Sequence, residues 1–169
     1  MERLWAPWRM KYISGESAKD VPDGACVLCL KWQERQDTEN LVLYRGDVCY
    51  MMMNLFPYSN GHLMVLPVRH IADFSSLSEA ERLEMFDLAQ KGMAALKRAM
   101  NPDGFNLGMN LGRVAGAGIS DHLHLHIVPR WNGDTNFMPV LGETKVISEG
   151  LDETYRKLKR ALAQATGGP

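Results

Sequence analysis

The sequence His122-Leu123-His124-Leu125-His126-Ile127-Val128 is the most informative segment of this chain. Histidine alternates with apolar residues at period two, so a strand here puts three imidazoles on one face and the apolar side chains in the core. The 169 residues contain only five histidines, and three of them fall in this segment. Folding does not require three titratable rings in a row, so the segment indicates a catalytic or binding site.

Three interpretations of this histidine row are open from the residues alone. The simplest is a solvent-facing strand surface that happens to use histidine. The second is a metal site: same-face neighbours lie about 6.6 Å apart and the outer pair about 13 Å apart, so two rings can share an ion but three cannot without strain. The third gives the rings separate roles, because histidine can act as a nucleophile and as a general acid near neutral pH. The distances favour a division of labour along the row.

The segment Gly112–Gly118 (GRVAGAG) directly precedes the row and is rich in glycine. Backbone N–H groups of such a loop can approach an anion closely. Taken alone the loop is weak evidence, since glycine-rich loops are often only flexible. Its position before three histidines indicates a phosphate-binding site.

The composition is that of an ordinary globular domain. There are 19 Lys and Arg against 20 Asp and Glu, 46% hydrophobic residues and 23% charged residues. This balance argues against a disordered chain and gives no sign of a nucleic-acid-binding surface. No window holds the roughly 18 consecutive apolar residues of a membrane helix, and the first residues lack the apolar core of a signal peptide. Three cysteines favour a reducing compartment, so we expect a cytoplasmic protein.

The remaining pattern predicts an α+β domain with a mostly antiparallel sheet. Strands are expected at 41–44, 48–53, 62–67, 105–110 and 122–128. A long helix is expected over 76–100, where Ser78 and Glu81 fit a capping box. Its apolar face is predicted to consist of Leu83, Phe86, Met93, Leu96 and Met100. A C-terminal amphipathic helix is predicted from Leu151, Tyr155, Leu158 and Leu162.

At every position, the histidine row matches the pattern His-φ-His-φ-His-φ-φ, with φ apolar, and so resembles the histidine-triad (HIT) superfamily. The segments 54–70 and 104–112 look like the neighbouring strands of that superfamily. The segments 4–13 and 129–140 resemble its bacterial diadenosine tetraphosphate phosphorylase/hydrolase-like branch. The resemblance implies a HIT-like fold: about five antiparallel strands, one long helix and a C-terminal helix, with the sheet extended across a homodimer.

The resemblance also divides the chain into three parts. Residues 1–25 are expected to form an N-terminal arm and loop, and residues 26–140 the HIT domain. Residues 141–169 are expected to form a C-terminal extension that contains the amphipathic helix.

The resemblance implies a covalent mechanism at the α-phosphate of a nucleotide. In the superfamily the middle histidine attacks the phosphorus, and that role falls on His124. His62 and His126 map onto catalytic positions that line the phosphate site. The positions implied for substrate binding are Asn54 at the ribose, and Asn110, Gly118 and His126 at the phosphate. Many relatives carry Gln and Ser just before the triad, where this chain has Gly118 and Ile119, so the group that assists the leaving group is left open.

The activity implied is cleavage of dinucleoside polyphosphates such as diadenosine tetraphosphate, with water or phosphate as acceptor. Two alternatives are a non-catalytic nucleotide-binding module and a nucleoside phosphoramidate hydrolase. A third is a zinc protein in which all the histidines serve the metal. The expected partners are a nucleotide substrate and a second copy of the chain, with no nucleic acid, no membrane and no organic cofactor.

The pair Cys26 and Cys29 has the spacing of half a zinc site. The simpler interpretation is two small apolar residues near a turn. HIT-like proteins with structural zinc pair such a motif with two histidines, which correspond to His70 and His122 here. The resemblance thus implies a closed Cys₂His₂ zinc site at Cys26, Cys29, His70 and His122. Cys49 lies in an apolar strand and is expected to be a buried hydrophobe.

Overall fold

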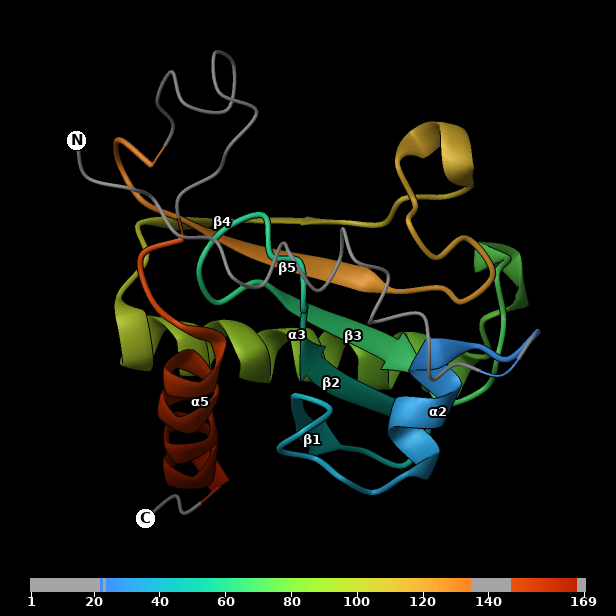
Figure 1. The fold of residues 1–169 in the computed structure, drawn as a ribbon, viewed down its shortest axis with the longest axis horizontal. Coiled ribbons are helices and arrows are strands. Elements are labelled where there is room, and N and C mark those ends of the chain that lie inside the picture. The colour runs from blue at the N-terminus through green and yellow to red at the C-terminus, as the bar shows by residue number, and fades with distance from the viewer. Residues whose placement is uncertain (1–21, 23, 135–146, 167–169) are drawn as a thin grey trace.

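The five predicted strands form one antiparallel sheet. The structure is a computed structural model that describes residues 22, 24–134 and 147–166. The strands are β1 (Val42–Arg45), β2 (Cys49–Met53), β3 (Leu63–Pro67), β4 (Gly104–Gly108) and β5 (Leu125–Arg130), in the order β1-β2-β3-β5-β4 (Figure 1). The α+β class is therefore confirmed. Strand β5 begins at Leu125, so the first two histidines of the row lie in the segment leading into it.

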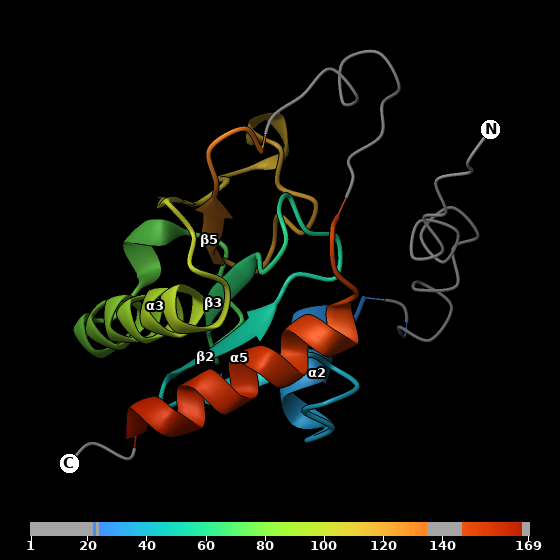
Figure 2. The same ribbon diagram turned by 90° about the vertical axis from the view of Figure 1, so that its left-hand side faces the viewer.

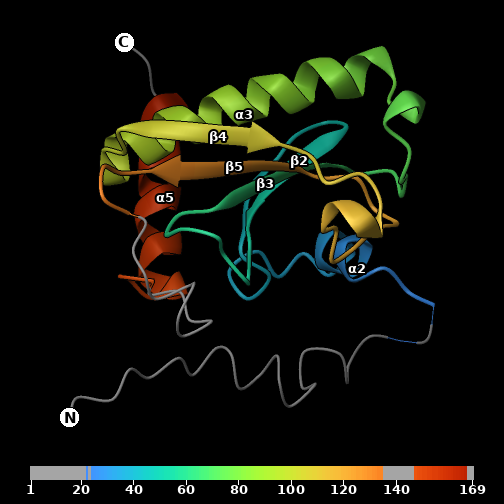
Figure 3. The same cartoon turned by 90° about the horizontal axis from the view of Figure 1, so that it is seen from above.

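The long helix α3 (Glu79–Met100) covers one face of this sheet. Its predicted capping box is present: the Ser78 hydroxyl accepts from the backbone N–H of Glu81, and the Glu81 carboxylate accepts from that of Ser78. The helix ends at Asn101, which adopts a left-handed conformation with φ 46°. Figure 3 shows α3 as a layer on one side of the sheet.

The predicted apolar face of α3 is wrong in its N-terminal half. Leu83 and Phe86 are 65% and 57% exposed. The prediction followed the large apolar side chains, whereas the helix packs on the sheet through a face that includes small ones. A Cβ at Gly92 would lie 2.8 Å from the Met51 Sδ, so glycine allows this close approach. The buried residues of α3 are Glu81, Met85, Leu88, Ala89, Gly92, Ala95 and Leu96.

Besides α3, the described residues form two further α-helices and two short 3-10 helices, η2 (Phe74–Ser76) and η3 (Arg113–Ala115). The C-terminal helix α5 (Leu151–Thr166; Figure 2) packs on α3 and β1. Its predicted positions Tyr155, Leu158 and Leu162 are buried. The short helix α2 (Val27–Gln33) was not predicted and covers the face of the sheet opposite α3 through Leu28. No helix in the described part of the chain is long and apolar enough to cross a membrane. Most of the predicted N-terminal arm and loop (residues 1–25) lies outside the described residues.

Candidate active site and metal centre

The predicted alternation of the histidine row is confirmed. Leu123, Leu125 and Ile127 are buried in the core beneath α3. The imidazoles take the opposite side of the segment, where His126 is paired in register with Met64 on β3 and Gly108 on β4. All three rings are at least nine-tenths buried. The row is therefore a built site and not a solvated strand surface.

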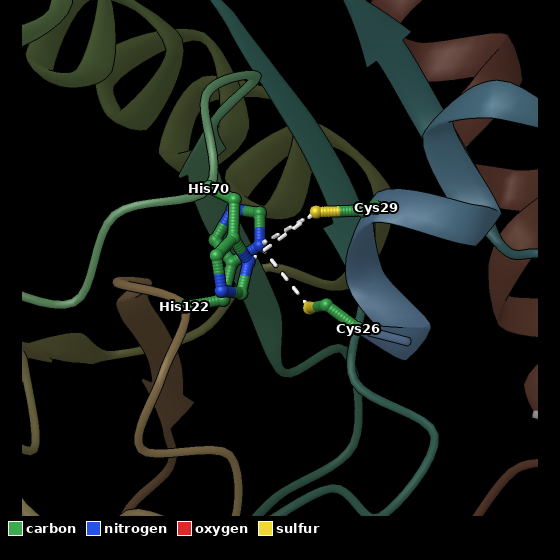
Figure 4. Close-up of side chains that lie close together, drawn as sticks. All are labelled: Cys26, Cys29, His70 and His122. Atoms are coloured by element: carbon green, nitrogen blue, oxygen red, sulfur yellow. Dashed lines mark hydrogen bonds between the residues drawn. The ribbon is translucent and has the colours of Figure 1, made fainter. Parts of the chain in front are cut away.

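His122 belongs to a cluster of four potential metal ligands (Figure 4). Cys26 and Cys29 come from the start of α2, His70 follows β3, and His122 precedes β5. Their ligand atoms all lie within 4.8 Å of one another. The Nδ1 of His122 is 3.4 Å from the Sγ of each cysteine, and the Nδ1 of His70 is 3.4 Å from the Sγ of Cys29. The four residues of the sequence-based prediction are thus brought together.

The chemistry of this cluster fits a tetrahedral metal ion. The Nε2 of His122 lies 2.9 Å from the carbonyl oxygen of Pro67, so it carries the hydrogen and leaves the Nδ1 lone pair for a metal. With Zn–S bonds of about 2.3 Å and Zn–N bonds of about 2.1 Å, tetrahedral ligands lie roughly 3.3–3.8 Å apart, which matches the contacts above. Burial and the neighbouring Cys26 raise the pKa of the Cys29 thiol to about 11. A bound cation removes this obstacle, because a coordinating thiol is deprotonated.

The segment that carries His70 is fixed to α3 by an ion pair. The guanidinium of Arg69 donates to both carboxylate oxygens of Glu81, at 2.8 and 2.7 Å. Hydrogen bonds from Arg69 and Ser78 outweigh burial and hold the pKa of Glu81 at about 2. Glu81 therefore caps the helix and also holds the backbone next to a candidate ligand.

His124 has one ring nitrogen held and the other available. Its Nδ1 lies 2.8 Å from the carbonyl oxygen of His122, an acceptor, so Nδ1 carries the hydrogen. The lone pair is then on Nε2, which forms no hydrogen bond among the described residues. Since every buried side-chain nitrogen and oxygen in this part of the chain has a partner, this nitrogen is in contact with solvent. Such an imidazole has the form that a nucleophile requires.

His62 and His126 form a hydrogen-bonded pair beside His124. The backbone N–H of Tyr58 donates to Nδ1 of His62 at 3.1 Å, so His62 carries its hydrogen on Nε2. That Nε2 donates to Nδ1 of His126 at 2.9 Å, which leaves the Nε2–H of His126 as a donor. Burial and then the nearby His124 lower the pKa of His126 to about 4. The pair is therefore neutral at pH 7 and presents an N–H group.

The predicted substrate-binding residues meet at this pair, with one exception. The amide Nδ2 of Asn54 lies 3.4 Å from Nδ1 of His62, and Nδ2 of Asn110 lies 3.5 Å from Nε2 of His126. Gly118 is exposed in the loop before the row, and no hydrogen bond among the described residues joins it to the histidines. Its role at the phosphate stays a prediction.

Sequence reasoning missed Tyr58, whose ring lies over the histidine pair. The centroid of the ring is 4.7 Å from that of His62 and 5.6 Å from that of His126. The only signal was an aromatic residue within the turn cluster before His62, which does not by itself reveal the direction of the side chain.

Comparison with known proteins agrees with this geometry. A family model described as the HIT domain matches residues 35–133 of the chain. A Mycobacterium tuberculosis protein named AP-4-A phosphorylase is 40% identical over 167 residues, covering 97% of this chain and 86% of that protein. An Arabidopsis thaliana protein named bifunctional bis(5'-adenosyl)-triphosphatase/adenylylsulfatase FHIT is 31% identical over 121 residues, covering 72% of this chain and 63% of that protein.

A solved structure shares the fold. The crystal structure of a Zn-bound histidine triad family protein from Mycobacterium smegmatis matches with a TM-score of 0.68 and 26% identity, covering 84% of this chain and 96% of that chain. The likeness thus extends over most of both chains.

Proposed function

The chain belongs to the HIT domain family, and from this premise we propose that it is an enzyme that cleaves dinucleoside polyphosphates, such as diadenosine tetraphosphate, at the α-phosphate. The observation that carries the proposal is the state of His124. Its Nδ1–H is held by the carbonyl of His122, and its Nε2 lone pair is available beside a neutral N–H donor on His126. A nucleophile and a hydrogen-bond donor for phosphate oxygens thus stand next to each other.

The reaction proceeds in two displacements. Nε2 of His124 attacks the α-phosphorus, the bond between that phosphorus and the bridging oxygen breaks, and the nucleoside polyphosphate leaves with the electron pair. The nucleoside monophosphate remains bound to Nε2, and the positive charge on the ring strengthens the hydrogen bond from Nδ1 to the carbonyl of His122. An oxygen of water or inorganic phosphate then attacks the phosphorus, and the P–Nε2 bond breaks with its electron pair returning to Nε2. When water attacks, its proton is released to solvent.

His126 and Asn110 act on the phosphate oxygens. Nε2–H of His126 and Nδ2 of Asn110 lie 3.5 Å apart, and both atoms are donors in the tautomer fixed by His62. Two neighbouring donors at this distance favour an anionic acceptor that binds to both, and a phosphate oxygen satisfies that requirement. Because both groups are neutral amide or imidazole donors, this recognition needs no basic surface.

We further propose that Cys26, Cys29, His70 and His122 hold a structural zinc ion. The support is the donor set and the available lone pair on His122, together with the Zn-bound relative. The ring of His122 is shared between this centre and Pro67, while its carbonyl orients His124. Stabilising the position of His122 therefore also stabilises the orientation of the nucleophile.

A homodimer is the proposed assembly. Strand β4 is at the edge of the sheet, and Leu107 on it is 42% exposed. Leu107 is paired with Ile127, so it points to the α3 side, where Leu83 and Phe86 are also exposed. A second copy that adds its own β4 would extend the sheet and cover apolar side chains. None of the three cysteines forms a disulfide, which supports the proposal of a cytoplasmic location.

Incubation with diadenosine tetraphosphate, with and without inorganic phosphate, tests the activity. ADP and ATP formed only with phosphate identify a phosphorylase, and the name of the 40% identical relative favours this outcome. AMP and ATP formed without phosphate identify a hydrolase. Binding without any product contradicts the proposal and identifies a nucleotide-binding module. Turnover of an adenosine phosphoramidate alone identifies the phosphoramidate hydrolase.

A further inference from the structure

The ring of Tyr58 lies over the proposed phosphate site, and it is too exposed to be a residue of the hydrophobic core. Its ring is tilted by 32° and 37° to the rings of His62 and His126, yet the residue is 46% exposed. Its hydroxyl lies 3.5 Å from Nδ2 of Asn110. One side of the ring is therefore against the histidine pair, and the hydroxyl is at the donor group that we assign to the phosphate.

The connection between β2 and β3 holds Tyr58 in this position through several polar contacts. The side-chain oxygen of Asn54 accepts from the backbone N–H of Phe56 at 2.9 Å, which forms an Asx turn. The backbone N–H of Tyr58 then donates to Nδ1 of His62 at 3.1 Å. The turn closes at Gly61, whose φ of +75° favours glycine and whose Cβ would lie 2.8 Å from a Leu96 methyl group.

The direction of the hydroxyl proton follows from the donor inventory. Nδ2 of Asn110 donates to the Oη of Tyr58, so the proton of the Tyr58 hydroxyl is not used in that contact. Tyr58, Asn110 and His126 thus offer three hydrogen-bond donors, connected by separations of 3.5 Å. An oxygen anion at this point can accept from all three.

We propose that the hydroxyl of Tyr58 is a third donor to the phosphate that His124 attacks. This inference rests on the proposed function and adds to it a third side chain that donates to the phosphate beside His126 and Asn110. The hydroxyl forms a hydrogen bond to a phosphate oxygen as charge builds up on it and keeps its proton throughout the reaction. The ring excludes water from the His62–His126 pair.

The test compares Tyr58→Phe with Tyr44→Phe. The first variant keeps the ring over the histidines and removes only the hydroxyl, and the second removes a hydroxyl on β1, where the ring is beside Lys91. We expect Tyr58→Phe to lower kcat/KM for diadenosine tetraphosphate by roughly 10- to 100-fold, mainly through kcat, and to weaken AMP binding, since loss of one donor to a developing charge has effects on this order. Tyr44→Phe is expected to stay within twofold of the wild type in both.

The outcomes separate this inference from the proposed function. If the wild type turns over the substrate and Tyr58→Phe matches Tyr44→Phe in kcat/KM and in AMP affinity, the donor role of Tyr58 is overturned while the enzyme assignment remains. If the wild type shows no turnover, the proposed function fails, and AMP binding measured by calorimetry decides the role of Tyr58. Weaker AMP binding by Tyr58→Phe alone supports the donor, and equal binding overturns it. Thermal unfolding of both variants shows whether the fold is intact.

Discussion

His122 and His124, two residues apart, donate hydrogen bonds through opposite ring nitrogens. His122 donates through Nε2 to the carbonyl of Pro67, and His124 donates through Nδ1 to the carbonyl of His122. The lone pair of His122 is therefore on Nδ1, toward the cysteines, and that of His124 is on Nε2, toward solvent. Two backbone carbonyls thus leave the lone pair of His122 for the proposed metal centre and that of His124 for the proposed nucleophilic attack.

Replacement of His124 by Gly tests the nucleophile. We expect the turnover of diadenosine tetraphosphate to fall by at least about 10³-fold, because the variant lacks the proposed nucleophile. Added imidazole should restore part of the activity to this variant, since the cavity left by the ring can hold the free base. A folded His124→Gly protein with near wild-type turnover would show that the assignment is wrong.

The metal centre predicts a difference between the cysteines. Protein purified without chelators should contain one zinc ion per chain by elemental analysis, and Cys26→Ser or Cys29→Ser should lose most of it. Cys49→Ala is the matched control, because Cys49 is buried in β2 and lies outside the ligand cluster. After chelator-free purification, we expect Cys26→Ser and Cys29→Ser to have a clearly lower Tm than the wild type. Cys49→Ala should lose only a small amount of stability through weaker packing. Absence of zinc from the wild type would contradict the proposal.

Much of the fold could be predicted because local patterns and final packing agree. The alternation in the histidine row placed Leu123, Leu125 and Ile127 in the core, and the capping box of Ser78 and Glu81 marked the helix start. The prediction of the buried face of α3 was wrong in part. Ala89 and Gly92 have too little apolar area to stand out in a sequence, yet they allow the helix to approach the sheet.

Some residues of the candidate site could be predicted from the sequence and others could not. The histidines and the Cys26–Cys29 pair could be found because their residue types are rare and their spacing is specific. Tyr58 could not, because its position depends on contacts that Asn54 and His62 make with the turn after folding. Glu84 carries no local signal either, since its partners lie 35 to 37 residues away along the chain.

Glu84 should be a main support of the β1–β2 turn. Its carboxylate accepts from the backbone N–H groups of Asp47, Val48 and Cys49 at 2.8, 2.7 and 2.6 Å. Although burial opposes ionisation, these donors lower the pKa of Glu84 below its usual value. We expect Glu84→Gln to lower the free energy of unfolding by about 2 kcal/mol or more, because it weakens hydrogen bonds to a charge.

The control for Glu84 is Asp87→Asn, an exposed position on the same helix. This change should stay within about 0.5 kcal/mol of the wild type in urea unfolding. Equal midpoints for Glu84→Gln and Asp87→Asn would contradict the role assigned to Glu84.

The His62–His126 pair should make stability depend on pH in mild acid. Burial, followed by repulsion from His124, lowers the pKa of His126 from 6.5 to about 4. Between these values the unfolded chain binds a proton that the native ring does not, so stability falls as the pH drops from 6.5 to about 4. The folded state keeps this contribution in full only above pH 6.5, where both forms are neutral.

Comparison with His126→Asn isolates this contribution. The variant lacks the titrating ring, so its free energy of unfolding should vary less over this pH range than that of the wild type. Both proteins retain the proposed metal ligands, so loss of metal in acid affects them equally. Parallel curves for the two proteins would show that His126 does not titrate as described.

The edge strand β4 predicts the effect of charge on assembly. In a dimer with a twofold axis between two copies of β4, a residue near the axis lies close to its own copy, so Leu107→Lys should bring two like charges together and remove apolar contact. Leu111→Lys is the matched control, because Leu111 is 51% exposed but follows the strand. By light scattering after size exclusion, the wild type and Leu111→Lys should have the mass of a dimer and Leu107→Lys that of a monomer. A monomeric wild type, or a dimeric Leu107→Lys protein of unchanged affinity, would exclude assembly through this edge.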